Sequence, residues 1–100
     1  MALDISEFSY PRPNLIVSRN GYSVEVRLPN TIFYQEGDRR MAIFAEALAT
    51  AEPKIAVRRQ DVKQWDPADD ESAVSDPERD RILQNVRRAF DFKGWILVIE

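Results

Sequence analysis

The sequence contains no cysteine and no histidine. Without cysteine, the chain can form neither disulfides nor thiolate metal sites, and it offers no cysteine nucleophile. The absence of histidine removes the commonest general base, the commonest transition-metal ligand and every Ser-His-Asp arrangement. Only carboxylates, lysine and tyrosine remain for acid–base chemistry, and no pattern of these residues indicates an active site. We therefore expect a protein that is not an enzyme and that carries no cofactor or metal.

Long hydrophobic runs and an excess of basic charge are also missing. No apolar stretch approaches the ~20 residues of a membrane-spanning helix, and the N-terminal MALDISEFSYPRPN lacks the basic segment and apolar core of a signal peptide. The formal net charge of −3 disfavours nucleic-acid binding, because phosphate neutralisation needs a basic face. We expect a cytoplasmic protein that binds neither nucleic acid nor membranes.

The composition that is present is typical of one globular domain. Of the 100 residues, 44% are hydrophobic and 31% are charged. Residues 1–13 contain two prolines and show no sustained periodicity, so we assign them to an N-terminal arm. Residues 14–100 form the domain.

The clearest predicted elements lie at the C-terminal end of the sequence. Residues 76–92 predict a long helix, which Ser75 and Glu78 cap as a capping box and which Gly94 ends in a left-handed conformation. One apolar stripe at helical spacing runs along this helix, formed by Ile82, Leu83, Val86, Ala89 and Phe90. Residues 95–99 are wholly apolar, which predicts a buried strand near the middle of a sheet.

The first half of the domain predicts a meander of short strands. Residues 15–18 and 22–28 flank Asn20-Gly21, a strong hairpin signal, and residues 31–35 follow as a third strand. In the second of these strands, Val24, Val26 and Leu28 alternate with Ser23, Glu25 and Arg27 on opposite faces.

The segment of residues 39–51 fits either a strand or a helix. Its alanines favour a helix by intrinsic propensity, whereas Met41, Ile43 and Ala45 also match one alternating face of a strand. A further short strand is predicted at residues 54–58. The predicted fold class is α+β: a small, mostly antiparallel sheet from a strand meander, with one long C-terminal helix followed by a buried terminal strand.

The acidic candidates for contact with a partner are four residues of one polar loop and the isolated Glu46. Asp66, Asp69, Asp70 and Glu71 lie in a polar loop without lysine or arginine, and their spacing does not match a calcium loop. The loop is either simply solvated or part of an acidic surface that meets a basic partner. Glu46, flanked by alanines, is likewise either a surface carboxylate or a contact residue.

Trp65 stands among polar residues in VKQWDP. An indole in such a place usually packs in the core, with its N–H bonded nearby. The alternative is an anchor for a protein partner, since tryptophan is over-represented at binding hot spots.

Several stretches resemble a family of small bacterial immunity proteins from polymorphic toxin systems, immunity protein 74. The similar features are VKQWDP, the helix start SDPERDRILQNV, the glycine before the terminal apolar strand, and the earlier LIVSRNGYSVEV and RRMAIFAEAL. The resemblance spans residues 14–100, although this chain has a longer N-terminal arm and has Ala45 where the family often carries a glycine.

The resemblance implies that residues 39–45 form a strand with Glu46 at its end. It also implies a cytoplasmic protein that binds and neutralises a cognate toxin, with no catalytic residues. From the residues alone, a second hypothesis remains: a structural or regulatory interaction module, such as a homodimer, with no toxin partner.

Overall fold

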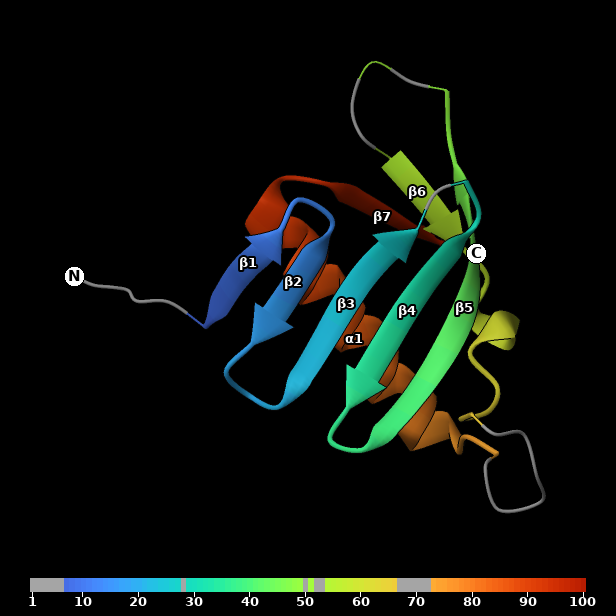
Figure 1. The fold of residues 1–100 in the computed structure, drawn as a ribbon. Helices are drawn as coiled ribbons and strands as arrows, with labels where there is room; N and C mark the ends of the chain where they lie inside the picture. Colours follow the sequence, from blue (N-terminus) through green and yellow to red (C-terminus); the bar gives the residue numbers. More distant parts are fainter. Residues whose placement is uncertain (1–6, 28, 50, 52–53, 67–72) are drawn as a thin grey trace.

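A computed structural model describes residues 7–27, 29–49, 51, 54–66 and 73–100. This part of the chain forms one seven-stranded sheet and one long helix (Figure 1). The strands lie side by side in sequence order, from β1 to β7, and neighbouring strands are antiparallel except for the parallel pair β6–β7. The predicted α+β class and the strand meander are therefore confirmed.

Except for β1, which falls in the expected N-terminal arm, the bounds of the strands and of the helix follow the predicted segments closely. They are β1 (Phe8–Arg12), β2 (Leu15–Ser18), β3 (Tyr22–Arg27), β4 (Thr31–Glu36), β5 (Arg39–Ala47), β6 (Lys54–Val57), the 3-10 turn η1 (Arg59–Asp61), α1 (Asp76–Lys93) and β7 (Ile96–Ile99). The predicted strand position Leu28 lies outside the described residues.

The β2–β3 hairpin forms where the Asn20-Gly21 signal predicts it. Gly21 has a φ of 96°, a conformation that residues with a Cβ rarely adopt. Ile16 pairs with Val24 across the hairpin, and both side chains are buried on the same face of the sheet. The turn therefore sets a register in which the apolar face of both strands points to the core.

Residues 39–47 form a strand, β5, and this resolves the ambiguity of that segment. Tertiary pairing overrides the helix propensity of the alanines, because residues 39–44 of β5 pair with β4 and residues 45–47 pair with β6. Met41, Ile43 and Ala45 are buried as one alternating face.

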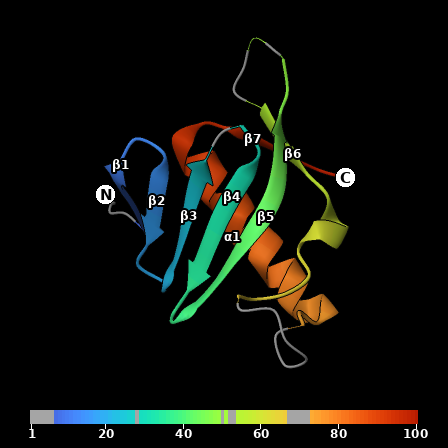
Figure 2. The ribbon, with the colours of Figure 1, turned by 45° about the vertical axis from the view of Figure 1, so that its right-hand side comes forward.

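Helix α1 begins and ends as the sequence predicts. The Ser75 hydroxyl accepts a hydrogen bond from the Glu78 amide, and the Glu78 carboxylate accepts one from the Ser75 amide, which completes the capping box. Gly94 has a φ of 76° and ends the helix. The five residues of the predicted stripe are all buried. Figure 2 shows α1 lying across one face of the sheet.

The terminal strand β7 does not lie near the middle of the sheet, so that prediction was wrong. β7 is the last strand in the order and pairs with β6 alone among the described strands. One face of this apolar run is covered: Leu97 is buried, and Trp95 and Ile99 pack against the core. Ile96 and Val98, which alternate onto the other face, are half-buried. Trp95 also meets Phe90 edge to face, with ring centroids 5.5 Å apart.

Part of the expected N-terminal arm belongs to the sheet. Phe8–Arg12 form β1, which pairs with β2 at the other end of the strand order. Phe8 packs against the core, 6.3 Å from Tyr22 between ring centroids, and Glu7 binds Arg88 of α1. Residues 1–6 lie outside the described part.

Candidate partner-binding face

The sheet has two unlike faces. Helix α1 covers one face, and in Figure 1 the described elements leave the other face of β2–β5 uncovered. We call this uncovered surface the open face; it consists of the outward-pointing side chains of β2–β5 together with Arg12 of β1. Strand alternation places there, among others, Arg12, Leu15, Ser23, Glu25, Arg27, Phe33, Gln35, Arg40 and Phe44.

Glu25 is the centre of an ion-pair cluster on the open face. Its Oε2 atom lies 3.3 Å from Arg12 Nη2 and accepts a hydrogen bond from Arg27 Nε at 3.1 Å. The Glu25 side chain is largely shielded, with 19% of its surface exposed, whereas the two arginine side chains remain about 60% exposed. One carboxylate therefore holds two guanidinium groups at the surface.

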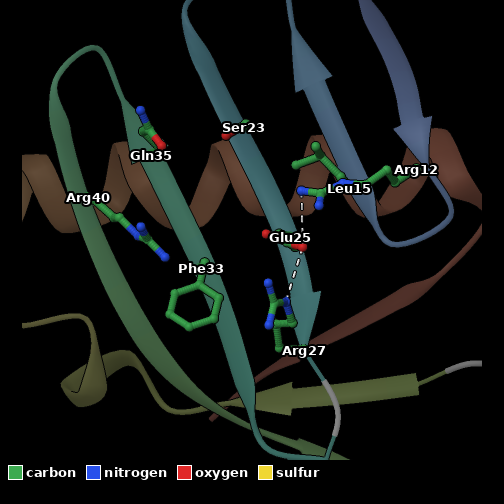
Figure 3. Close-up of a pocket in the computed structure, with 8 residues that line it drawn as sticks. All are labelled: Arg12, Leu15, Ser23, Glu25, Arg27, Phe33, Gln35 and Arg40. Carbon is green, nitrogen blue, oxygen red and sulfur yellow. Dashed lines mark hydrogen bonds and ion pairs between the residues drawn. The ribbon is translucent and has the colours of Figure 1, made fainter.

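Phe33 lies beside this cluster, between two arginines. The guanidinium carbon of Arg40 is 4.9 Å from the centre of the Phe33 ring, and that of Arg27 is 5.7 Å away. Both distances are within the range of cation–π contacts. Figure 3 shows the phenyl ring lying between these two side chains. Phe33 and both arginines line a surface depression of about 350 Å³.

The open face carries a net positive charge, although the net charge of the whole chain is negative. The depression contains three arginines and one glutamate, a local charge of +2, whereas the whole chain carries −3. Glu25 and Arg27 were predicted on an outer face from strand alternation, whereas Arg12, Phe33 and Arg40 were not predicted as contact residues. The alternation of Phe33 with buried Ile32 and Tyr34 was the signal that would have shown an aromatic residue pointing away from the core.

Glu46 lies farther along β5, in a second depression of about 260 Å³ with Phe44, Ala56, Arg58 and Glu100. Glu46 is exposed and pairs with Ala56 in the sheet register. Phe44 is 51% exposed, whereas phenylalanine is among the residues most often buried in folded proteins. An aromatic side chain thus extends the uncovered surface toward Glu46.

The structure describes the predicted acidic segment in part. Asp66 is exposed, and its backbone amide donates to the carbonyl of Arg40 at 2.7 Å. Asp69, Asp70 and Glu71 lie outside the described residues. Farther on, the acids at the start of α1 are paired within the chain: Asp76 with Arg79, Asp80 with Arg59, and Glu78 with Arg39.

Trp65 is a core residue, as the more usual interpretation of an isolated tryptophan predicts. It is 2% exposed, and its ring centroid lies 6.1 Å from that of Tyr34. The Arg39 guanidinium covers it, 4.5 Å from the ring centre. Its indole N–H finds no acceptor among the described residues, which differs from the expected hydrogen bond. Burial leaves this indole almost no surface for a partner.

Other titratable groups connect α1 to the sheet. The Tyr34 hydroxyl donates to Glu36 Oε2 at 2.7 Å and accepts from Asn85 Nδ2 at 2.8 Å. Arg81 binds both oxygens of Glu36, at 3.2 and 2.6 Å, and this contact raises the pKa of the Arg81 guanidinium. Burial, with a contribution from Glu36, raises the pKa of Tyr34. These groups stabilise the fold.

Among the described residues, no group of three or more acidic side chains is arranged to hold a metal ion. In the same part of the chain, no helix has the length and apolar character needed to cross a membrane.

Comparison with known proteins gives one match. The family model described as immunity protein 74 matches residues 24–100, which run from within β3 to the end of β7. No curated protein and no solved structure matches the chain.

Proposed function

Because this chain belongs to the immunity protein 74 family, we propose that it binds a cognate bacterial toxin and neutralises it stoichiometrically, without a catalytic step. The observation that carries the proposal is the family match, which covers most of the sheet and all of α1. We place this activity in the cytoplasm.

The organisation of the charged side chains supports binding rather than catalysis. Glu36, Glu78 and Asp80 are each engaged with an arginine. The open face, in contrast, presents arginine and phenylalanine side chains to solvent, and aromatic residues and arginine are enriched in protein interfaces. Exposed Asp66 and Glu46 remain candidate contacts, as do Asp69, Asp70 and Glu71.

The experiment tests a candidate toxin domain, taken from the gene that neighbours the gene for this chain, by co-purification. The tagged toxin domain and the untagged immunity chain are expressed together, and light scattering measures the molar mass of the purified complex. We expect a 1:1 complex, and we expect the toxin's activity to fall in proportion to the immunity chain added, reaching zero near equal molarity. A toxin domain from an unrelated system is the control. Failure of the cognate domain to bind would overturn the proposal.

One observation favours a second candidate, an interaction module that forms a homodimer. The apolar strand β7 ends the sheet order, and an edge strand can pair with a second chain. A dimeric mass for the free protein, together with no binding to the neighbouring toxin, would favour this candidate over toxin neutralisation.

A further inference from the structure

We propose that the open face is the surface that contacts the toxin, and that it receives an acidic segment of that protein. Arg27 and Arg40 contact the carboxylates of this segment, and Phe33 packs against its apolar atoms. This inference rests on the proposed function, because it specifies the contact surface and the chemistry of the same partner.

The arginines of the open face have fewer carboxylate partners than those that lie on or against α1. Five arginines on or against α1 each contact a carboxylate of this chain: Arg39, Arg59, Arg79, Arg81 and Arg88. On the open face, Arg12 and Arg27 share the single carboxylate of Glu25. Arg40 has no carboxylate partner among the described residues, and its guanidinium rests on Phe33. The open face therefore has more arginines than carboxylates around the ring of Phe33.

Arg27 and Arg40 are held in place before a partner binds. Arg27 binds Glu25 through its Nε, and its side chain remains 61% exposed. A guanidinium fixed in this way loses less conformational freedom when it binds a partner carboxylate, and its planar fork matches a carboxylate in a bidentate contact. Arg40 is similarly restrained by the ring of Phe33.

The charge of the open face fits an acidic protein segment better than a nucleic acid. A nucleic acid presents a continuous row of phosphates, and the open face offers only a local +2 with Glu25 at its centre. The chain as a whole carries −3 and would repel an extended polyanion. A short segment with a few carboxylates and some apolar surface fits both the charge and Phe33.

The test compares two variants with equal changes in charge. The open-face variant is Arg27→Glu with Arg40→Glu. The control is Arg19→Glu with Arg87→Glu, two arginines that are exposed elsewhere on the molecule. Association with the cognate toxin domain is measured by surface plasmon resonance at low and at physiological salt. Denaturant unfolding establishes that both variants fold.

We expect the open-face variant to bind at least about tenfold more weakly, with a slower association rate and a reduced salt dependence, because it replaces attraction by repulsion. The control should change affinity much less. If the glutamate variant does not fold, Arg27→Gln with Arg40→Gln keeps the size of the side chains and should still weaken binding.

Three outcomes would overturn the inference. The first is an open-face variant that binds as tightly as the unchanged protein. The second is loss of binding only in a variant with Asp69→Lys, Asp70→Lys and Glu71→Lys, which would assign the contact to the acidic loop of this chain instead of the open face. The third is displacement of the toxin by a single-stranded oligonucleotide that binds the unchanged protein but not the open-face variant. If the unchanged protein binds no toxin, the proposed function itself fails.

Discussion

At the scale of single residues, Tyr34 does more than fill the core. Its ring is completely buried between Tyr22 and Trp65, and its hydroxyl joins Glu36 of the sheet to Asn85 of the helix. A neutral hydroxyl can be both donor and acceptor here, whereas a phenolate beside a carboxylate would lose the donor and add repulsion. The packing therefore depends on the protonated form of Tyr34.

This dependence predicts a loss of stability in alkaline solution. The pKa of Tyr34 is raised above the ordinary value of 10.0, so its contribution is complete below pH 10 and is lost as the pH rises above it. Tyr34→Phe should lower stability by about 1–2 kcal/mol at pH 7, through the lost hydrogen bonds. Above pH 10, the free energy of unfolding should fall less steeply with pH in the variant than in the unchanged protein. The two slopes should differ by up to about 1.4 kcal/mol per pH unit.

Urea unfolding of both proteins at pH 7, 9, 10 and 11 checks this expectation. The burial of Tyr22, whose pKa is also raised, gives both proteins a common alkaline slope, so the difference between them isolates Tyr34. Parallel stability curves over this range would show that Tyr34 ionises as easily in the folded protein as in the unfolded chain.

The candidate site shows which residue-level features a sequence can predict. Alternation within one strand correctly placed Glu25 and Arg27 outward. The pairing of Arg40 with the ring of Phe33 depends instead on the register between β4 and β5, and β5 was the segment whose secondary structure was ambiguous. Arg12 was assigned to an arm. Cross-strand clusters thus stayed hidden until the strands were aligned.

At the scale of elements, local signals predicted boundaries better than positions in the sheet. The capping box, Gly94 and the Asn20-Gly21 hairpin act over a few residues, and each was predicted correctly. The position of β7 depends on the whole strand order, which an apolar run does not report. β1 was hidden by Pro11, which an edge strand tolerates because one side of it has no ladder to complete.

The capping box provides a prediction for α1. Ser75→Ala removes the acceptor for the Glu78 amide and should lower stability by about 1 kcal/mol, within the usual range of ~0.5–2 kcal/mol. Ser75→Asp keeps an acceptor and places a negative charge at the positive end of the helix, so it should retain most of the stability. Chemical unfolding monitored by circular dichroism measures both. Equal stability of the alanine variant and the unchanged protein would contradict a structural role for the cap.

At the scale of the whole molecule, charge is distributed according to the two faces of the sheet. Ion pairs such as Arg81–Glu36 and Arg88–Glu7 connect α1 to the strands. On the open face, two arginines share one carboxylate and a third rests on an aromatic ring. One face is therefore engaged in holding the fold together, and the other remains available for contact.

The parallel pairing of β6 and β7 has a consequence for the order of folding. Strands β2–β5 pair with their nearest neighbours in sequence, whereas β7 reaches β6 only after the whole of α1, as in the pairing of Lys54 with Ile96. Contacts between distant residues require closure of a long loop and tend to form late. Ile32→Ala should therefore mainly slow refolding, whereas Leu97→Ala should mainly accelerate unfolding. Stopped-flow chevron plots measure the refolding and unfolding rates separately. If Leu97→Ala slowed refolding more than Ile32→Ala, the pairing of β7 with β6, and not the β2–β5 meander, would belong to the folding nucleus.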